Sequence, residues 1–151
     1  MTTTQKLPIV DSIAQEHSER LLAYIKQQIE ERSGKISFAD YMHHCLYTPG
    51  LGYYSAGSHK LGDKGDFTTA PEISSLFSRT LAQHIIDIFQ QIDQHTILEF
   101  GAGSGKMVID ILLELEAKSA LPEQYYIIEV SADLQERQRN NIASSIPHLL
   151  N

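Results

Sequence analysis

Three glycines and two glutamates form the pattern in this sequence that is best suited to ligand chemistry. Gly101, Gly103 and Gly105 come directly after a short apolar run, and Glu99 stands just before them. Glycine has no Cβ, so the backbone here can come close to a bound molecule. Glu129 follows the next apolar run, and its carboxylate can accept hydrogen bonds from the 2′- and 3′-hydroxyls of a ribose. Together the five residues predict a site for a nucleoside-containing ligand.

The spacing of the glycines discriminates between classes of such ligands. A dinucleotide fingerprint that starts at Gly101 needs glycine at position 106, where the sequence has Lys106. A phosphate-binding P-loop needs a wider gap between its glycines, and Ser or Thr in place of Met107. What remains is the E-x-G-x-G-x-G pattern of class I S-adenosylmethionine (SAM) methyltransferases. SAM carries an ammonium and a sulfonium group, and the acid at Glu99 favours cationic groups nearby.

Two parallel strands must bring these residues together. Residues 95–100 and 125–130 are predicted as buried strands, a helix follows Gly105, and Ser131 caps a last helix that runs to about Ile142. This order is a βαβ unit, whose strands are parallel with a right-handed crossover. Ligands of open α/β sheets bind beyond the carboxyl ends of the strands, which is where Glu99 and Glu129 fall. The predicted fold class is therefore α/β, with a Rossmann-like sheet.

The first half of the chain shows helical and loop patterns. We predict a helix over residues 18–33, a short helix capped by Ser37, and a glycine-rich stretch without periodicity over 48–70. Apolar residues at helical spacing then predict one long helix from Pro71 to Ile92. We accordingly divide the chain into a helical and glycine-rich region, 1–70, and the start of a SAM-binding Rossmann-like domain, 71–151.

Composition excludes several classes of function. The chain has 151 residues, 12 basic against 19 acidic, and a net charge of −7, which argues against nucleic acid as a partner. Its apolar runs are too short to span a membrane. The first residues show neither a signal peptide nor an Arg-rich transit peptide, so we expect a cytoplasmic protein.

The residues that most often bind metals give no indication of a metal site. Cys45 is the sole cysteine, which excludes an intramolecular disulfide and a cysteine cluster. The seven histidines are scattered, and the adjacent His43 and His44 would point in different directions on a helix. We expect each histidine to lie at the surface or partly buried, and we predict no metal.

A second motif adds a family resemblance. Gly-Asp-Phe at 65–67 and Pro-Glu-Ile-Ser at 71–74 would, taken alone, only cap a turn and start a helix. Together with Gly-Tyr-Tyr at 52–54 and the glycine turn, they resemble the MidA-like family of SAM-dependent methyltransferases. The resemblance runs from about Ile36 to Ile142. The family commonly continues with Phe-Gly-Glu, whereas this chain has Phe77-Ser78-Arg79, which reverses a charge.

The resemblance implies a function and a set of site residues. It implies SAM as cofactor and a protein substrate methylated on arginine, as mitochondrial members do on a subunit of respiratory complex I during assembly. It also implies that segment 65–74 folds over the cofactor. The candidate cofactor-binding residues are Glu99, Gly101, Ala102, Gly103, Gly105, Glu129, Thr69 and Pro71. Asp66 and Glu72 are the two acids that merit testing for a catalytic role.

The position of the motif also bears on completeness. After Glu129 there is enough chain for one helix, so about two strands of the methyltransferase sheet are supplied. We therefore expect an incomplete Rossmann-like class I fold with a helical and loop N-terminal cap. It is either the N-terminal portion of a longer protein, which we favour, or a chain whose exposed sheet edge allows homo-oligomerisation.

Two alternatives to an enzyme of this class stay open. The first is a non-catalytic binding or assembly module that keeps the SAM fold, and we do not expect this chain to catalyse methyl transfer alone. The second is a fragment of an NAD-binding oxidoreductase, which Lys106 disfavours because it replaces a glycine of the fingerprint.

Overall fold

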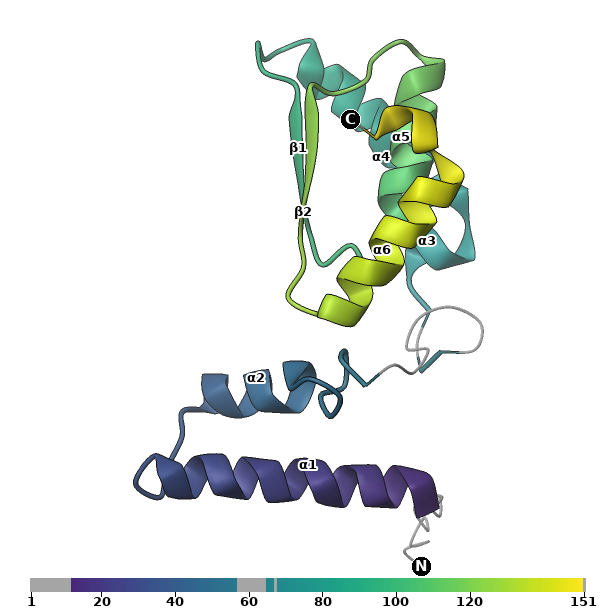
Figure 1. The fold of residues 1–151 in the computed structure, drawn as a ribbon. Helices are drawn as coiled ribbons and strands as arrows, with labels where there is room; N and C mark the ends of the chain where they lie inside the picture. The colour runs from purple at the N-terminus through teal and green to yellow at the C-terminus, as the bar shows by residue number, and fades with distance from the viewer. Residues whose placement is uncertain (1–11, 57–64, 67, 151) are drawn as a thin grey trace, which may run out of the picture. The chain divides into compact units, whose positions relative to one another are not determined.

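The structure is a computed structural model that describes residues 12–56, 65–66 and 68–150. The chain forms two compact units, Met1–Ala56 and Gly57–Asn151 (Figure 1). Our division of the chain at residue 70 stays a prediction. Among the described residues, none of the helices is long and apolar enough to cross a bilayer.

The first unit is a pair of packed helices, α1 (Ser12–Glu31) and α2 (Phe38–Tyr47). Helix α1 begins at Ser12, earlier than the predicted residue 18, because the polar first turns lack the apolar periodicity on which that prediction relied. Gly34 ends the helix as predicted: its φ is 82°, and its N–H donates to the Ile29 carbonyl at 2.9 Å. Ser37 caps α2 as predicted by accepting from the Asp40 N–H at 3.0 Å.

Several large apolar side chains of α2 are not the ones that it buries. Phe38, Tyr41 and Met42 are exposed, whereas His44 is buried. The His44 ring meets Tyr24 of α1 edge-on, with ring centroids 5.4 Å apart. The prediction that each histidine is at the surface or partly buried is therefore wrong for His44. An aromatic contact with α1 thus accompanies the burial of the His44 ring.

The second unit begins with two helices where the sequence predicted one. Helix α3 (Ala70–Ile73) ends at Ile73, and after Ser74 the helix α4 (Ser75–Phe89) starts. Ser74 has an extended backbone, with φ −159°, and its side chain accepts from the Leu76 N–H at 3.1 Å. A serine that caps the following helix in this way interrupts a continuous apolar period. The predicted helix is therefore broken at Ser74, and it ends at Phe89 rather than Ile92.

A parallel two-stranded sheet follows, as predicted. Strand β1 (Thr96–Phe100) pairs with β2 (Gln124–Ile128), with Leu98 opposite Tyr126. Helix α5 (Lys106–Ala117) connects the strands, and α6 (Ala132–Ser145) leads to a short 3₁₀ helix, η1 (Pro147–Leu149). Ser131 caps α6 as predicted, accepting from the Leu134 N–H at 3.2 Å. The carboxyl ends of the two strands therefore lie side by side.

The helices cover one face of this sheet. In Figure 1, α4, α5 and α6 lie on the same side of the two strands. Ala82, Ile111 and Leu115 form the core of this layer, and Ile97 and Tyr125 of the sheet pack against it. The alternate side chains of both strands are exposed, so the prediction of buried strands is wrong for one face.

Candidate functional site

The glycine turn leaves β1 at its carboxyl end and leads into α5. The Gly101 N–H donates to the Ile128 carbonyl at 2.9 Å, which extends the ladder between the strands. The turn closes with the Gly105 N–H on the Ala102 carbonyl at 2.8 Å. Gly101, Gly103 and Gly105 have φ values of 65°, 56° and 82°, in the left-handed region that glycine adopts without strain. The turn therefore requires the glycine pattern that the sequence shows.

Space above the first glycine fits the close approach of a ligand. A Cβ built on Gly101 would meet nothing within 4 Å, and Gly101 itself is exposed. A bound molecule could therefore contact its backbone. Ala102, in contrast, is buried beneath the turn. The sequence predicted both as cofactor-binding, but only Gly101 offers an open backbone.

Glu129 lies at the carboxyl end of β2, directly before α6. Its Oε1 accepts from the Ser131 N–H at 2.8 Å, and its Oε2 is 3.4 Å from the Gln138 Nε2. Gln135 holds the main chain of the same residue by donating to the Glu129 carbonyl at 2.7 Å. A carboxylate at the start of a helix is also favoured by the helix dipole. The acid is thus half-buried and held in one orientation beside the glycine turn.

Glu99 occupies a different environment from Glu129. Its side chain is 8% exposed and points to the helix-covered face of the sheet, as Ile97 does. The Tyr125 Oη donates to Glu99 Oε2 at 2.7 Å. Burial raises the pKa of Glu99, and the hydrogen bond from Tyr125 opposes this rise. A buried carboxylate whose charge is costly would be stabilised by a nearby cation.

Helix α3 is joined to the glycine turn through Glu72. Ser104 Oγ, inside the turn, donates to Glu72 Oε1 at 2.5 Å. Pro71 is half-buried in the same short helix. Thr69 and Asp66 are both exposed, and the Thr69 carbonyl accepts from the Glu72 N–H at 2.9 Å. Of the residues predicted in segment 65–74, the structure therefore ties Glu72 to the turn.

Helix α6 contributes two residues that sequence reasoning missed. Gln138 donates to the Gly103 carbonyl at 3.0 Å, and Asn141 donates to the Ser104 carbonyl at 2.8 Å. The two residues stand three positions apart, so they share one face of the helix. A pair of amides at this spacing, on the helix that follows the second strand, is the signal that could have found them. Tyr125 was missed because its contact with Glu99 depends on strand register.

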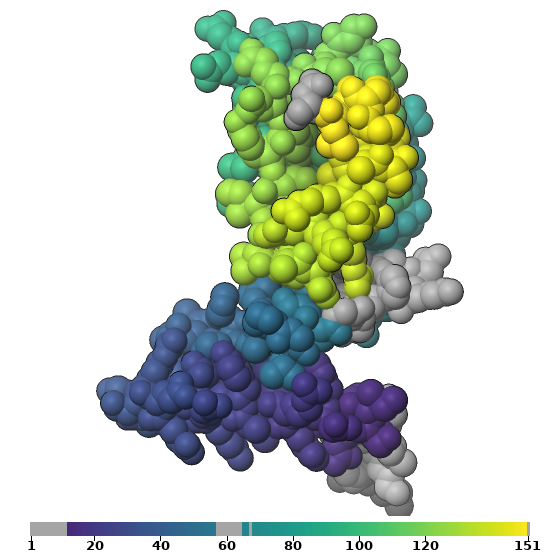
Figure 2. Space-filling view, viewed as in Figure 1, coloured from purple at the N-terminus to yellow at the C-terminus, as the bar shows by residue number. Residues whose placement is uncertain are grey.

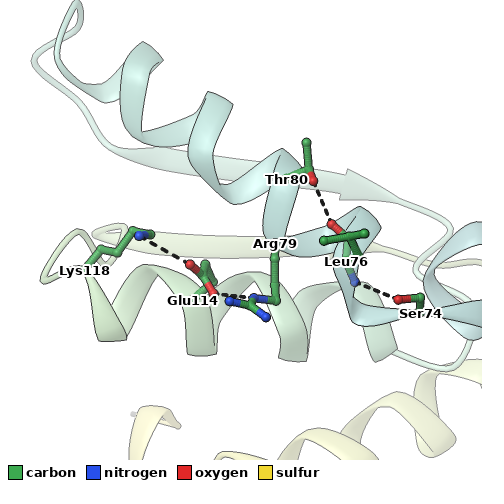
Figure 3. A network of polar contacts seen from close by, with 6 residues as sticks. All are labelled: Ser74, Leu76, Arg79, Thr80, Glu114 and Lys118. Carbon is green, nitrogen blue, oxygen red and sulfur yellow. Dashed lines mark hydrogen bonds and ion pairs between the residues drawn. The ribbon is translucent and has the colours of Figure 1, made fainter.

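The charge reversal at Arg79 has a local explanation. Arg79 Nε donates to Glu114 Oε2 of α5 at 2.7 Å, and Lys118 Nζ lies 3.5 Å from Glu114 Oε1 (Figure 3). The hydrogen bond from Arg79 lowers the pKa of Glu114. Arg79, at the position where the resemblance implied a glutamate, therefore joins α4 to α5.

The cavities of the second unit do not all border the candidate site. A hollow of about 280 Å³ lies beside Glu129 and is also lined by Gln135, Gln138 and Arg139. A larger hollow of about 480 Å³ runs along β2 to Leu150, and no predicted site residue lines it. We therefore locate the candidate site by the turn and the two acids rather than by the volume of a cavity.

Comparisons with known proteins agree on one family. Residues 80–151 match the profile of a family of S-adenosyl-L-methionine-dependent methyltransferases. The mitochondrial protein arginine methyltransferase NDUFAF7 is 33% identical in Homo sapiens over 78% of this chain, and 31% identical in Rattus norvegicus over 81%. These matches cover 28% and 29% of the relatives, so the chain spans less than a third of their length.

The location that we predicted is corrected by these relatives. The proteins from Homo sapiens, Rattus norvegicus and Danio rerio are all named mitochondrial. The expectation of a cytoplasmic protein, which relied on the first few residues, is therefore wrong.

A solved structure confirms the predicted fold class. A protein from Burkholderia thailandensis bound to S-adenosyl-homocysteine matches 95% of this chain with a TM-score of 0.80 and 38% identity, over 38% of its own length. A second structure from that organism matches with a TM-score of 0.74 and 36% identity. The α/β architecture is thus part of a Rossmann-like fold. The chain is therefore similar, in sequence and in fold, to SAM-dependent methyltransferases, as its resemblance to the MidA-like family implied.

Proposed function

We propose that this chain forms the SAM-binding part of a protein methyltransferase. The observation that carries the proposal is the position of the glycine turn and Glu129 at the adjacent carboxyl ends of two parallel strands. This is the place where open α/β sheets bind ligands. The match to a structure that holds S-adenosyl-homocysteine supports the same cofactor class.

The residues present fit SAM group by group. We assign the ribose hydroxyls to Glu129, whose carboxylate is already oriented by Ser131 and Gln138. The open backbone of Gly101 can lie against the cofactor. Glu99 would gain from a cation, and SAM brings an ammonium group. Lys106 stands where a dinucleotide-binding turn needs glycine, so NAD fits less well.

The remaining predicted residues divide into two proposed roles. We assign Glu72 to positioning the turn, because its carboxylate is engaged by Ser104. Thr69 and Pro71 belong to the same segment and would border the cofactor. Asp66 is exposed and stays a candidate for a catalytic role.

The chemistry of the bound cofactor sets what the protein must do. SAM supplies a methyl group on a sulfonium. A nucleophile must approach the methyl carbon in line with the carbon–sulfur bond that breaks. The task of the protein is thus mainly positioning. We propose arginine in a protein as the acceptor, since the relatives are named protein arginine methyltransferases.

Ligand binding tests the proposal directly. We expect the purified chain to bind SAM and S-adenosyl-homocysteine in calorimetry, and to bind NAD far more weakly. Glu129→Ala should weaken binding about tenfold or more, because a hydrogen bond to a charged group contributes roughly 1.5–3 kcal/mol. Glu136→Ala, an exposed acid on the same helix, is the matched control and should bind as wild type does. Binding of NAD alone would contradict the cofactor assignment.

A methyl-transfer assay separates an enzyme from a binding module. Labelled SAM would be incubated with the chain and arginine-containing proteins, and label would be traced to arginine. Incorporation that is lost in Glu129→Ala supports catalysis by this chain. Tight S-adenosyl-homocysteine binding without incorporation supports a binding module.

A further inference from the structure

Gln138 contacts both parts of the candidate site at once. Its side chain is 4% exposed and lies on α6, which follows the surface of the second unit in Figure 2. The amide nitrogen donates to the Gly103 carbonyl at 3.0 Å and lies 3.4 Å from Glu129 Oε2. A side-chain amide carries two N–H donors, so a single Gln can serve both acceptors.

The glycine turn is also packed against the same side chain. A Cβ built on Gly105 would lie 3.5 Å from the Gln138 Cα and 3.6 Å from its Cγ. Helix α6 therefore approaches the turn closely at this residue. Gln138 fills the space between the turn and the ribose-binding acid, and its amide links them.

We infer that Gln138 is a positioning residue that sets the orientation of Glu129 relative to the glycine turn. The inference rests on the proposed function, because it matters only if the turn and Glu129 bind one cofactor. Its physical basis is that each oxygen of the Glu129 carboxylate is held by a different donor. Ser131 holds Oε1 and Gln138 holds Oε2, so the rotation of the group is restricted while lone pairs remain for two ribose hydroxyls.

Loss of the Gln138 amide should lower ligand affinity through its effect on Glu129. Without it, the carboxylate keeps one donor and can rotate, so the ligand must order it on binding. The Gly103 carbonyl also loses its partner from α6. We expect a roughly tenfold loss of S-adenosyl-homocysteine affinity, the effect of losing one hydrogen bond to a charged group.

The test uses Gln138→Met, which keeps an unbranched side chain of similar length and removes both donors. Calorimetry would measure S-adenosyl-homocysteine binding by wild type, Gln138→Met, Glu129→Ala and the double variant. The expected result is a roughly tenfold loss for Gln138→Met alone and less than about twofold when it is added to Glu129→Ala. Asn140→Ala removes an exposed amide from the same helix and should bind as wild type does.

Packing and donor effects are separated by a second variant. Gln138→Leu has a different shape from Gln138→Met but also lacks the N–H donors. If the donors set the affinity, both variants should lose affinity by the same factor. Thermal unfolding of each variant without ligand checks that the fold is retained.

Three outcomes would overturn the inference. If wild type binds and Gln138→Met binds equally well, the inference fails while the proposed function stands. The same holds if Gln138→Met causes an equal loss of affinity in wild type and in the Glu129→Ala background. Failure of wild type to bind S-adenosyl-homocysteine overturns the proposed function and the inference with it.

Discussion

Glu99 shows how a single buried acid links stability to ligand binding. Its carboxylate is 8% exposed, and Tyr125 supplies one hydrogen bond. The residue type and its place before the glycines could be recognised in the sequence. Its burial and its tyrosine partner could not, because both depend on which residues of β2 lie beside β1. The same holds for Gln138 and Asn141, whose role follows from the position of α6.

We expect Glu99→Gln to stabilise the ligand-free protein at neutral pH. The folded pKa of Glu99 is raised above its ordinary value of 4.5 by burial, so the native state holds the proton more tightly than the unfolded state. This stabilising contribution is complete below pH 4.5 and is lost as pH rises through the folded pKa. Gln is neutral throughout and can still accept from Tyr125.

The check is urea unfolding of both proteins below pH 4.5 and at neutral pH. The advantage of Glu99→Gln should shrink at the lower pH, where Glu99 is protonated. Glu136→Gln changes an exposed acid and serves as the control. An advantage for wild type that grows as pH rises would show that the sign is wrong.

At the scale of elements, the βαβ unit was predictable and the helix before it was not. The spacing of apolar residues changes where β1 begins, the glycine turn precedes α5, and Ser131 precedes α6. These signals predicted β1, α5, β2 and the start of α6 closely. The break at Ser74 was hidden because Ile73, Leu76 and Phe77 keep helical spacing across it. Only the extended backbone of Ser74 and its bond to the Leu76 N–H reveal two helices.

Ser74→Ala should lower the unfolding free energy by about 1 kcal/mol, the usual effect of losing an N-cap side chain. It removes the acceptor of the Leu76 N–H, which Figure 3 shows at the start of α4. Urea unfolding measures the loss. Ser75→Ala, at the exposed first residue of α4, should change stability far less. Equal losses in the two variants would mean that the cap does not define the break.

At the scale of the whole molecule, helices on one face of the sheet leave the other face apolar and exposed. The exposed large apolar side chains of the two strands are Leu98, Phe100, Tyr126 and Ile128. The sequence predicted apolar strands correctly, but composition alone cannot tell a strand covered on both faces from one covered on a single face. The number of covering elements decides this, and it is a property of the assembled unit.

This apolar row should govern the solubility of the second unit. Contiguous apolar surface of this kind promotes association, and Phe100 is 72% exposed. We expect Phe100→Lys to weaken concentration-dependent association in sedimentation velocity. It should change the unfolding free energy by no more than about 0.5 kcal/mol, because the side chain has few contacts to lose. Ile88→Lys adds the same charge at an exposed position of α4 and tests whether charge alone is responsible. If both variants reduce association equally, net charge rather than the sheet face controls it; if only Phe100→Lys does, the uncovered face is the surface through which the chain associates.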